Sequence, residues 1–393
     1  MPIDELPSSV DIVVIGAGII GSAIAARLAT QDISVCVVDR FEPAAGCSSA
    51  GEGNILVSDK LPGADLALAL RSALLWRELG AKLGNEIEFE PKGGLVVART
   101  DEELTKLFAL ARDQQLQGVR ARFLSPDELR TVEPTLSEQV AGGVFYDDDA
   151  QVQPMRAVSA YVAETRRLGG RVVAGAEVLG AEFDQERRIR YVMTTAGRVE
   201  AGTCVVNAAG PWAGELAGRF GAKVPVVPRR GHVLVTEPVS PITGHKVYEA
   251  SYVGDIRGTG SDWTVSAVVE ATLSGTMLLG SSREFIGFSR MTNPAIVAAI
   301  ARQAIGLFPC LNGVRLMRTY LGFRPATPDG LPIIGRDTSI PGLLHATGHE
   351  GAGIGLAEGT AEAIEDLVLG RVSAIDMSPF SPERFDAGVP ARP

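Results

Sequence analysis

The segment GAGIIG, residues 16–21, constrains the fold of this 393-residue chain more than any other stretch. It follows DIVVIG, Asp11–Gly16, a short apolar run of the kind that forms a buried parallel strand. A helical pattern covers Ile19–Ala29, and a second apolar run, SVCVVD, covers Ser34–Asp39. Strand, helix and strand in such close succession predict a β-α-β unit and therefore a parallel sheet near the N-terminus.

The spacing of the three glycines is that of a dinucleotide-binding turn. Gly16 permits the tight turn, Gly18 lets the backbone approach a pyrophosphate, and Gly21 lets helix and strand pack closely. The following helix then presents its positive N-terminal end to the phosphates. The residues expected at this part of the dinucleotide are Gly16, Gly18, Ile19, Ile20 and Gly21.

Two residues at the end of the second strand bear on which dinucleotide binds. Asp39 comes about 20 residues after the glycines, where a carboxylate can bind the ribose hydroxyls of an adenosine. Arg40 could meet a 2'-phosphate, but it fits a solvated surface position as easily. These features predict a bound dinucleotide and leave the choice between FAD and NAD(P) open.

The rest of the chain alternates helical and strand patterns around a β-rich middle. Residues 230–280 are rich in β-branched residues and turn glycines, which predicts a mainly antiparallel sheet. We expect helices at Leu61–Leu83, Asp101–Gln115, Met155–Gly170 and from about Gly353 to Leu369, and strands at Gly93–Ala98, Arg171–Val173, Glu177–Phe183, Arg188–Thr194, Thr203–Gly210, Leu331–Ile334 and Leu343–Ala346.

These patterns predict an α/β fold: a Rossmann-like dinucleotide-binding domain with an inserted α+β substrate domain on a mainly antiparallel sheet. We expect the first domain to be discontinuous and the second to be inserted into it. The first would comprise residues 1–90, 142–228 and 320–393, and the second residues 91–141 and 229–319.

Composition narrows the class of partner. A net charge of -10 argues against nucleic acid and anionic membranes, because the chain has no basic excess with which to neutralise phosphates. The scattered Cys36, Cys47, Cys204 and Cys310 argue against a metal cluster and a disulfide framework, and favour a cytoplasmic protein. The start, MPIDELPSSVDIVVIGAGIIGSA, has neither a basic signal-peptide region nor an unbroken apolar span.

Beyond its first motif, the chain resembles the flavin-dependent amine and amino-acid oxidoreductases. Four blocks carry the resemblance over nearly the whole chain: VVIGAGIIGSAIA, CSSAGEGNI, VVNAAGPWAGEL, and FRPATPDGLPIIG with TGHEGAGIGLA. That family includes glycine oxidase, sarcosine oxidase and D-amino-acid oxidase, and the closest likeness is to the flavoprotein (beta) subunits of D-hydroxyproline and opine dehydrogenases. The resemblance implies non-covalent FAD and an FAD-binding Rossmann-like domain.

The activity that the resemblance implies is oxidation of the C-N bond of a small amino or imino acid by hydride transfer to flavin N5. D-hydroxyproline, sarcosine, glycine, D-proline and opines are the substrates to consider. Two alternatives stay open. The chain could be a flavin-holding electron-relay subunit without substrate chemistry of its own, or an NAD(P)-dependent dehydrogenase.

The resemblance also implies which residues contact FAD. Small residues after the second strand would lie along the flavin ring, a later valine would face the adenine, and a helix start near the C-terminus would direct amides at the pyrimidine end of the ring. The residues are Ser48, Ser49, Ala50, Gly51, Gly53 and Asn54 for the ring, Val178 for the adenine, Ala208, Gly210 and Trp212 for the pyrophosphate, and Gly351, Ala352, Gly353 and Ile354 for the pyrimidine end.

Five further residues are candidates for contact with the substrate. Arg324 matches the arginine that binds the substrate carboxylate in glycine oxidase, where paired guanidinium donors fix the Cα-H over the flavin. Tyr252, with Tyr248 beside it, lies on the stretch that would face the substrate. His349 is either catalytic or structural, because hydride transfer from a neutral amine needs no general base. Glu52 either holds a cationic amine or points to solvent at a turn.

Departures from the family favour a dehydrogenase over an oxidase. Leu278 stands near the place of the oxygen-activating lysine of sarcosine oxidase, and this loss tilts the balance toward a dehydrogenase, although glycine oxidase also lacks that lysine and still reacts with oxygen. Gly322 stands where sarcosine oxidase has its flavin-linking cysteine, which implies a flavin that is not bound through that link. Gly355 falls near its substrate-binding lysine, and Gly351 replaces an arginine of glycine oxidase. Electrons would then leave through other subunits of a heteromeric dehydrogenase that carry iron-sulfur centres, since the cysteines here could not hold one.

Overall fold

The computed structural model describes residues 4–240, 242–252 and 263–386, and the chain divides into two compact units. The first unit comprises Met1–Ser49, Gln153–Pro228 and Phe323–Pro393, and the second comprises Ala50–Val152 and Arg229–Gly322. Residues 50–90, 142–152 and 320–322 therefore belong to the second unit, whereas we expected them in the first domain. One reason is that β3 (Asn54–Ile55) pairs with β7 (Ala150–Gln151) inside the second unit.

The first unit is built on a mainly parallel sheet with the strand order β17-β18-β11-β1-β2-β8. Its strands are β1 (Ser9–Ile15), β2 (Val35–Val38), β8 (Arg171–Val173), β9 (Val178–Phe183), β10 (Ile189–Thr194), β11 (Gly197–Asn207), β17 (Ile333–Arg336) and β18 (Leu343–Thr347). β1 pairs in parallel with β2 and with β11, and β11 with β18. The hairpin of β9 and β10 extends β11 in the antiparallel sense. The expected β-α-β start is confirmed.

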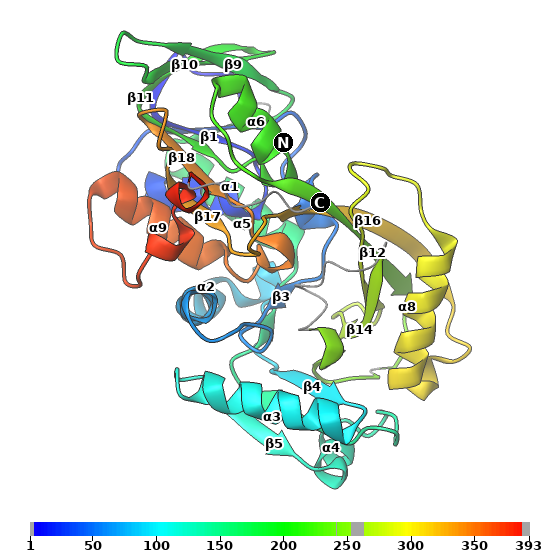
Figure 1. The fold of residues 1–393 in the computed structure, drawn as a ribbon. Coiled ribbons are helices and arrows are strands. Elements are labelled where there is room, and N and C mark those ends of the chain that lie inside the picture. Colours follow the sequence, from blue (N-terminus) through cyan, green and yellow to red (C-terminus); the bar gives the residue numbers. More distant parts are fainter. Residues whose placement is uncertain (1–3, 241, 253–262, 387–393) are drawn as a thin grey trace. The chain divides into compact units, whose positions relative to one another are not determined.

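Helices cover this sheet because the strands are apolar on both faces. The helices of the first unit are α1 (Ile19–Ala29), α5 (Pro154–Arg167), α6 (Ala213–Phe220) and α9 (Ala357–Leu369). α1 packs against both α5 and α9 (Figure 1). Small residues line α1, including Ala23, Ala25 and Ala26, so its neighbours can approach closely. α6 packs on β9, and its Phe220 joins the core with Val13 and Val205.

The second unit is built on a largely antiparallel sheet with the strand order β16-β12-β15-β14-β13-β4-β6-β5. Its strands are β4 (Gly94–Ala98), β5 (Ala121–Leu124), β6 (Gly142–Tyr146), β12 (Val227–Thr236), β13 (Lys246–Glu249), β14 (Thr264–Ala271), β15 (Met277–Arg283) and β16 (Leu316–Ala326). β13 pairs with β4 in parallel and with β14 in antiparallel fashion. The expected antiparallel sheet is therefore present, although residues 253–262 of the expected stretch lie outside the described residues.

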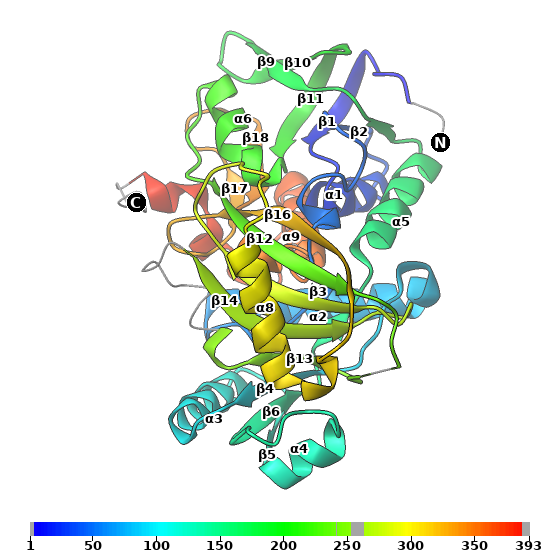
Figure 2. The ribbon, with the colours of Figure 1, turned by 90° about the vertical axis from the view of Figure 1, so that its right-hand side faces the viewer.

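The helices of the second unit are α2 (Ala64–Ile87), α3 (Asp101–Gln115), α4 (Pro126–Val132) and α8 (Pro294–Leu307). α8 packs on β14 and β15 (Figure 2), where Ile296 and Ile300 join a core with Leu279. Local capping sets two of the starts: Thr100 accepts from the amide of Glu103, and Ser125 forms a capping box with Glu128. In the described ranges, no helix is both long and apolar enough to cross a membrane.

Candidate functional site

The glycine turn between β1 and α1 has the steric features that the sequence predicts. Gly16 has φ +113°, and a Cβ there would lie 2.4 Å from the carbonyl oxygen of Ala208. A Cβ at Gly21 would lie 1.9 Å from the carbonyl oxygen of Gly16. Neither position can hold a side chain without movement of the backbone. The turn therefore has the tight, glycine-lined form that a pyrophosphate needs.

Polar contacts fix the two segments beside this turn. Asp39, after β2, accepts hydrogen bonds from the amides of Ala17 (2.7 Å) and Phe41 (2.8 Å). Burial raises the pKa of this carboxyl, and the backbone donors oppose the rise. Ser48 Oγ accepts a hydrogen bond of 2.9 Å from the amide of Ile19, in the first turn of α1. The expected dinucleotide residues of β1, α1 and β2 are thus joined to the start of the segment 48–54.

Arg40 and Trp212 stack on one another at the same end of the sheet. The Arg40 guanidinium carbon lies 4.2 Å from the centre of the Trp212 ring, and it also lies over Phe41. Trp212 ends a short 3₁₀ turn that Gly210 begins, with φ +54°. Thr347 donates a hydrogen bond of 3.0 Å to the carbonyl oxygen of Gly210. The third and last sequence blocks therefore meet within the first unit, and Arg40 lies against the third.

Val178, the expected adenine contact, begins β9 and is buried. The amide of Ala176 donates 2.8 Å to the carbonyl oxygen of Asp39, which holds the start of this segment at the end of β2. Arg219 of α6 donates a hydrogen bond to the carbonyl oxygen of Val178. The Val178 carbonyl oxygen thus already accepts one hydrogen bond from within the unit.

The boundary between the units falls within β16, after Gly322, so Arg324, near the end of that strand, belongs to the first unit. Its Nε lies 3.3 Å from the position that a Cβ on Gly351 would occupy. Burial raises the pKa of the nearby Cys47 thiol to about 11, while the positive charge of Arg324 lowers it and the negative charge of Glu350 raises it further. The structure therefore brings Arg324 together with Cys47 and with the turn that carries Glu350 and Gly351.

The C-terminal glycine turn is more internally bonded than we expected. Residues Glu350–Ala352 form a 3₁₀ turn, and α9 begins only at Ala357 rather than near Gly353. The amide of Gly351 donates to the Glu350 carboxylate, and the amide of Ala352 donates 2.9 Å to the carbonyl oxygen of His349. Two of the four amides assigned to the flavin pyrimidine thus have acceptors within the turn.

His349 is fully enclosed by the first unit. Its Nε2 is 2.9 Å from Thr360 Oγ1, on α9. Burial lowers the pKa of the imidazole to about 3, so the ring is neutral near pH 7. A neutral, hydrogen-bonded histidine at this place holds the glycine turn against α9, which supports the structural alternative for this residue.

The segment from Ala50 to Asn54 packs tightly inside the second unit. A Cβ on Gly53 would lie 1.7 Å from the carbonyl oxygen of Val152. A Cβ on Gly322 would lie 2.7 Å from the Cβ of Ala50, and Tyr320 donates to the carbonyl oxygen of Gly51 at 3.3 Å. Contacts within the protein therefore account for part of the small size of these residues, which we had attributed to the flavin.

Glu52 is buried, with 8% of its surface exposed, so the alternative that it points to solvent is wrong. Its Oε2 lies 3.4 Å from Lys246 Nζ and accepts 3.0 Å from the Asn54 amide nitrogen. Lys246 also donates to Glu270 Oε2 at 2.8 Å and to Asn54 Oδ1. We call Glu52, Asn54, Lys246 and Glu270 the buried ionic cluster.

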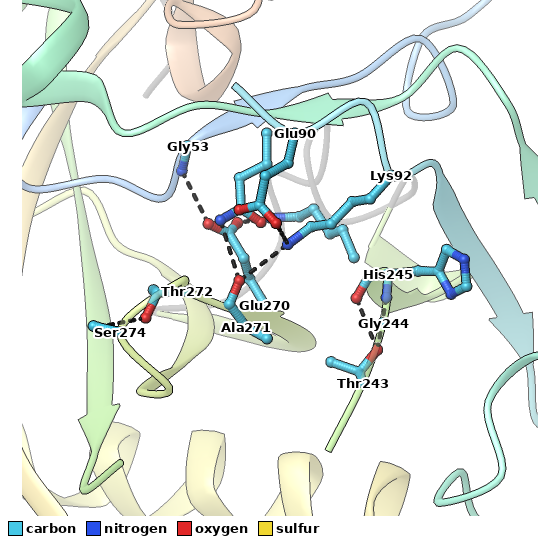
Figure 3. A network of polar contacts seen from close by, with 12 residues as sticks. Gly53, Glu90, Lys92, Thr243, Gly244, His245, Glu270, Ala271, Thr272 and Ser274 are labelled. Atoms are coloured by element: carbon cyan, nitrogen blue, oxygen red, sulfur yellow. Dashed lines mark hydrogen bonds and ion pairs between the residues drawn. The ribbon is translucent and has the colours of Figure 1, made fainter. Parts of the chain in front are cut away.

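The buried ionic cluster joins a wider set of polar contacts between β13, β14 and the segment before β4. Figure 3 shows Glu270 beside Gly53, whose amide donates to Glu270 Oε1 at 3.4 Å. Lys92 Nζ donates 3.0 Å to the carbonyl oxygen of Ala271 and lies 3.6 Å from Glu90 Oε2. Sequence reasoning missed Lys246 and Glu270, because no local pattern distinguishes two charged residues on separate strands of a sheet.

Tyr252 and Tyr248 lie together in the second unit, with ring centres 5.1 Å apart. The guanidinium of Arg283 lies over the Tyr252 ring at 4.6 Å. Tyr248 donates 2.6 Å to Ser58 Oγ, and Ser58 in turn is hydrogen-bonded to Asp149. The hydroxyl of Tyr248 therefore serves a buried network, whereas Tyr252 packs against an arginine that sequence reasoning did not single out.

Comparison with known proteins agrees with these features. The family described as FAD dependent oxidoreductase (DAO) matches residues 11–367. The chain is similar to hydrogen cyanide synthase subunit HcnC of Pseudomonas aeruginosa, at 29% identity over 95% of this chain and 96% of HcnC. The crystal structure of glycine oxidase from Geobacillus kaustophilus aligns with a TM-score of 0.85 at 26% identity, covering 95% of this chain and 98% of that one.

A further solved structure, L-proline dehydrogenase from P. horikoshii, aligns with a TM-score of 0.89 at 24% identity, covering 98% and 99% of the two chains. At that identity it shows the shared fold. The resemblance read from the four sequence blocks and the α/β fold class are confirmed, and the cofactor that the glycine turn left open is FAD rather than NAD(P). The glycine-lined turn, which side chains at Gly16 and Gly21 would fill, fits that cofactor. The chain belongs to the DAO family of FAD-dependent oxidoreductases.

Proposed function

We propose that this protein oxidises the C-N bond of a small amino or imino acid, and that Arg324 orients the substrate carboxylate. The observation that carries the proposal is the place of Arg324 beside Gly351, where a Cβ would lie 3.3 Å from the guanidinium Nε. A guanidinium presents paired donors to a carboxylate, and this two-point contact fixes the direction of the substrate Cα-H. FAD, when bound, supplies the hydride acceptor at N5.

The relatives support this class of substrate. Glycine oxidase is the name of curated relatives in Geobacillus kaustophilus and Bacillus subtilis, each 27% identical to this chain. Their shared chemistry, oxidation at the carbon that bears an amino acid's nitrogen, needs a carboxylate contact and an acceptor but no metal. D-hydroxyproline, sarcosine, glycine, D-proline and opines are the substrates that we propose to test. Tyr252 would shape the pocket, and His349 would support the glycine turn.

The FAD contacts that we propose are those of the sequence blocks. Gly16, Gly18 and Gly21 would let the backbone approach the pyrophosphate, and Asp39 would bind the ribose. Ser48 to Asn54 would follow the ring without a covalent bond, since Gly322 offers no thiol. Gly351, Ala352, Gly353 and Ile354 remain the residues that we propose for the pyrimidine end, and the amides of Gly351 and Ala352 also have acceptors within the turn.

We propose a dehydrogenase rather than an oxidase. Leu278, near the position of the oxygen-activating lysine of sarcosine oxidase, carries no charge. The electrons would pass to partner subunits with iron-sulfur centres. Among the described residues, no three His, Cys, Asp or Glu side chains gather as a metal site would require, so such a centre is not expected in this part of the chain.

The experiment is anaerobic mixing of the FAD-loaded protein with each candidate substrate, followed by admission of air. Bleaching of the flavin absorbance by a candidate identifies the substrate, and slow recovery in air supports a dehydrogenase. In Arg324→Ala, the substrate concentration for half-maximal bleaching should rise about tenfold to a hundredfold, the value of a charged hydrogen-bonded contact. Arg318→Ala, on the exposed part of β16, is the matched control.

Two results would contradict the proposal. If Arg324→Ala is reduced with the same concentration dependence as the wild type, Arg324 does not bind the substrate. If the wild-type protein is yellow and no candidate bleaches it, the alternative of an electron-relay subunit gains support.

A further inference from the structure

One carboxylate oxygen of the buried ionic cluster has no hydrogen-bond partner among the described residues. This oxygen is Glu52 Oε1, while Oε2 of the same carboxylate is held by Lys246 and Asn54. Leaving a buried carboxylate oxygen without a donor costs free energy, so native proteins pair such atoms with a protein group, a water or a ligand. Glu52 Oε1 is therefore an oxygen for which the described fold supplies no donor.

The charges around Glu52 do not balance. In the cluster, the two carboxylates of Glu52 and Glu270 face the single cation of Lys246. Both partners of Lys246 are almost fully enclosed, as is Lys246 itself, with 2% exposure. Burial alone would lower the pKa of Lys246, but Glu270 and Glu52 raise it, so the amine is charged. The neighbouring Lys92 and Glu90 offset one another, which leaves the cluster with one net negative charge.

The carboxylate of Glu52 is held in a fixed orientation. Lys246 donates to Asn54 Oδ1, and the Asn54 amide nitrogen donates to Glu52 Oε2. Because Oε2 faces these two residues, Glu52 Oε1 points away from them. It meets β15 at Gly280, where a Cβ would lie 2.2 Å from Oε1. Gly280 thus makes room for the carboxylate. The hydroxyl of Tyr320, a neighbouring donor, is directed to the carbonyl oxygen of Gly51.

We propose that Glu52 Oε1 receives a cationic nitrogen of the substrate. This inference rests on the proposed function, because it assigns a protein contact to the nitrogen of the proposed amino or imino acid. The ligand chemistry follows from the cluster: a donor with a positive charge satisfies the oxygen and neutralises the excess negative charge in one contact. Two nitrogens share that chemistry, the reacting amine and a cation farther along the substrate.

The test compares carboxylate ligands that carry no, one or two cationic nitrogens. Glycine, sarcosine, L-proline, D-proline and D-hydroxyproline carry one cation, and the two enantiomers of arginine and lysine carry two. Tetrahydro-2-furoate, in which a ring oxygen replaces the proline nitrogen, carries none. Dissociation constants come from perturbation of the flavin spectrum of the FAD-loaded protein under anaerobic conditions, for the wild type and for Glu52→Gln.

In Glu52→Gln, we expect the dissociation constant of cationic ligands to rise about tenfold to a hundredfold, the value of a charged hydrogen bond. The dissociation constant of tetrahydro-2-furoate should change less than about twofold, or fall slightly, because a negative charge is lost. An effect on every amine assigns the reacting nitrogen to Glu52. An effect confined to arginine or lysine assigns the distal cation. Equal affinity of both proteins for all amines would overturn the inference.

A second variant tests the same point without removing the charge. In Gly280→Ala, the added methyl group displaces the Glu52 carboxylate, so amines should bind more weakly while tetrahydro-2-furoate is unaffected. Glu249→Gln is the matched control. Its carboxylate is also buried and pairs with Arg99. Glu249 lies three positions after Lys246 on β13, and an odd separation places the two side chains on opposite faces of the sheet. The same loss of amine affinity in Glu249→Gln would contradict a specific role for Glu52.

The outcome also separates this inference from the proposed function. If no amine reduces or perturbs the flavin of the wild-type protein, the proposed function fails first. If amines reduce the wild type, and Glu52→Gln and Gly280→Ala bind them equally well, the proposed function stands and the role of Glu52 is overturned.

Discussion

The glycine turn of the first unit and the buried ionic cluster of the second are stabilised in different ways. In the turn, the decisive contacts are between backbone atoms, and a Cβ at Gly21 would meet the carbonyl oxygen of Gly16. In the cluster, Lys246 pairs with two buried carboxylates. The first arrangement is sensitive to shape and the second to charge. An added side chain should therefore destabilise the glycine turn most, and removal of a charge should destabilise the buried ionic cluster most.

The largest effect is expected from removal of the cation of the cluster. Lys246→Met keeps a long apolar stem but leaves Glu52 and Glu270 buried without their counter-charge. Breaking a buried ion pair in this way costs about 3–5 kcal/mol. We expect a fall of that size in the free energy of unfolding, measured by urea denaturation of the FAD-loaded protein.

A matched control is Lys106→Met, which breaks an exposed pair with Glu102 on α3. Exposed pairs of this kind contribute about 0.5 kcal/mol or less. The double variant Lys246→Met with Glu270→Gln should recover part of the loss, because one of the two uncompensated charges is removed as well. A Lys246→Met protein as stable as Lys106→Met would show that the cluster is not sensitive to charge.

A smaller but still large effect is expected at the glycine turn. In Gly21→Ala, the methyl group would lie 1.9 Å from the carbonyl oxygen of Gly16, so the turn must shift. Overpacking of this kind costs about 1–3 kcal/mol, and we expect loss of bound FAD as well. Gly218→Ala on α6 is the control, since a Cβ there meets nothing within 4 Å and alanine favours a helix. Equal FAD content in the two variants would contradict the steric account.

The same contrast explains how much could be predicted from the sequence. GAGIIG and its flanking strands lie within one short stretch, so periodicity and spacing predicted β1, α1 and β2 closely. Arg324 and the glycine turn at 351 were found through a resemblance between sequence blocks. The cluster is different, because Glu52, Lys246 and Glu270 are brought together by the pairing of β13 with β14 and by packing of residues 50–54. Nothing local in the sequence marks such an assembly.

The two units should also differ in how pH affects them. In the second unit, burial raises the pKa of Asp149 to about 7. The hydrogen bonds that Asp149 accepts from Ser58 and Val57 oppose this rise. In the first unit, burial also acts to raise the pKa of Asp337, but hydrogen bonds from His345 and Ser339 hold it at about 2. The ordinary value for both is 3.8. The two carboxyls therefore shift in opposite directions.

The sign of each contribution follows from proton binding. Asp149 keeps its proton when folded while the unfolded chain loses it, so its contribution to stability falls as pH rises from about 4 to about 7. Asp337 is ionised in the folded protein down to a lower pH than in the unfolded chain. Its contribution to stability is therefore lost as pH falls from about 4 toward 2. We expect Asp149→Asn and Asp337→Asn to remove these slopes, which amount to about 4 kcal/mol for the buried Asp149 and to about 2 kcal/mol or less for the half-buried Asp337.

Urea denaturation across pH 2 to 8 measures both slopes as differences from the wild type. Asn keeps the size of Asp at each site, so each variant removes the titration with little change in volume. If the free energy of unfolding of the wild type and that of Asp149→Asn differ by the same amount at every pH, the pKa of Asp149 is not raised. If the free energies of unfolding of the wild type and of Asp337→Asn change equally with pH below pH 4, the pKa of Asp337 is not lowered.

The smallest effect on stability, and the sharpest on function, is expected at Gly351. A Cβ there lies 3.3 Å from Arg324 Nε, a contact that a shift of a few tenths of an ångström relieves, so Gly351→Ala should cost less than about 0.5 kcal/mol. The shift moves the guanidinium, however, and a displaced two-point contact should raise the dissociation constant of tetrahydro-2-furoate about threefold to tenfold. Gly202→Ala in β11, where a Cβ makes only ordinary contacts, is the control. If the two variants bind the carboxylate equally, Gly351 does not set the position of Arg324; if they differ, shape governs the carboxylate contact as it governs the glycine turn.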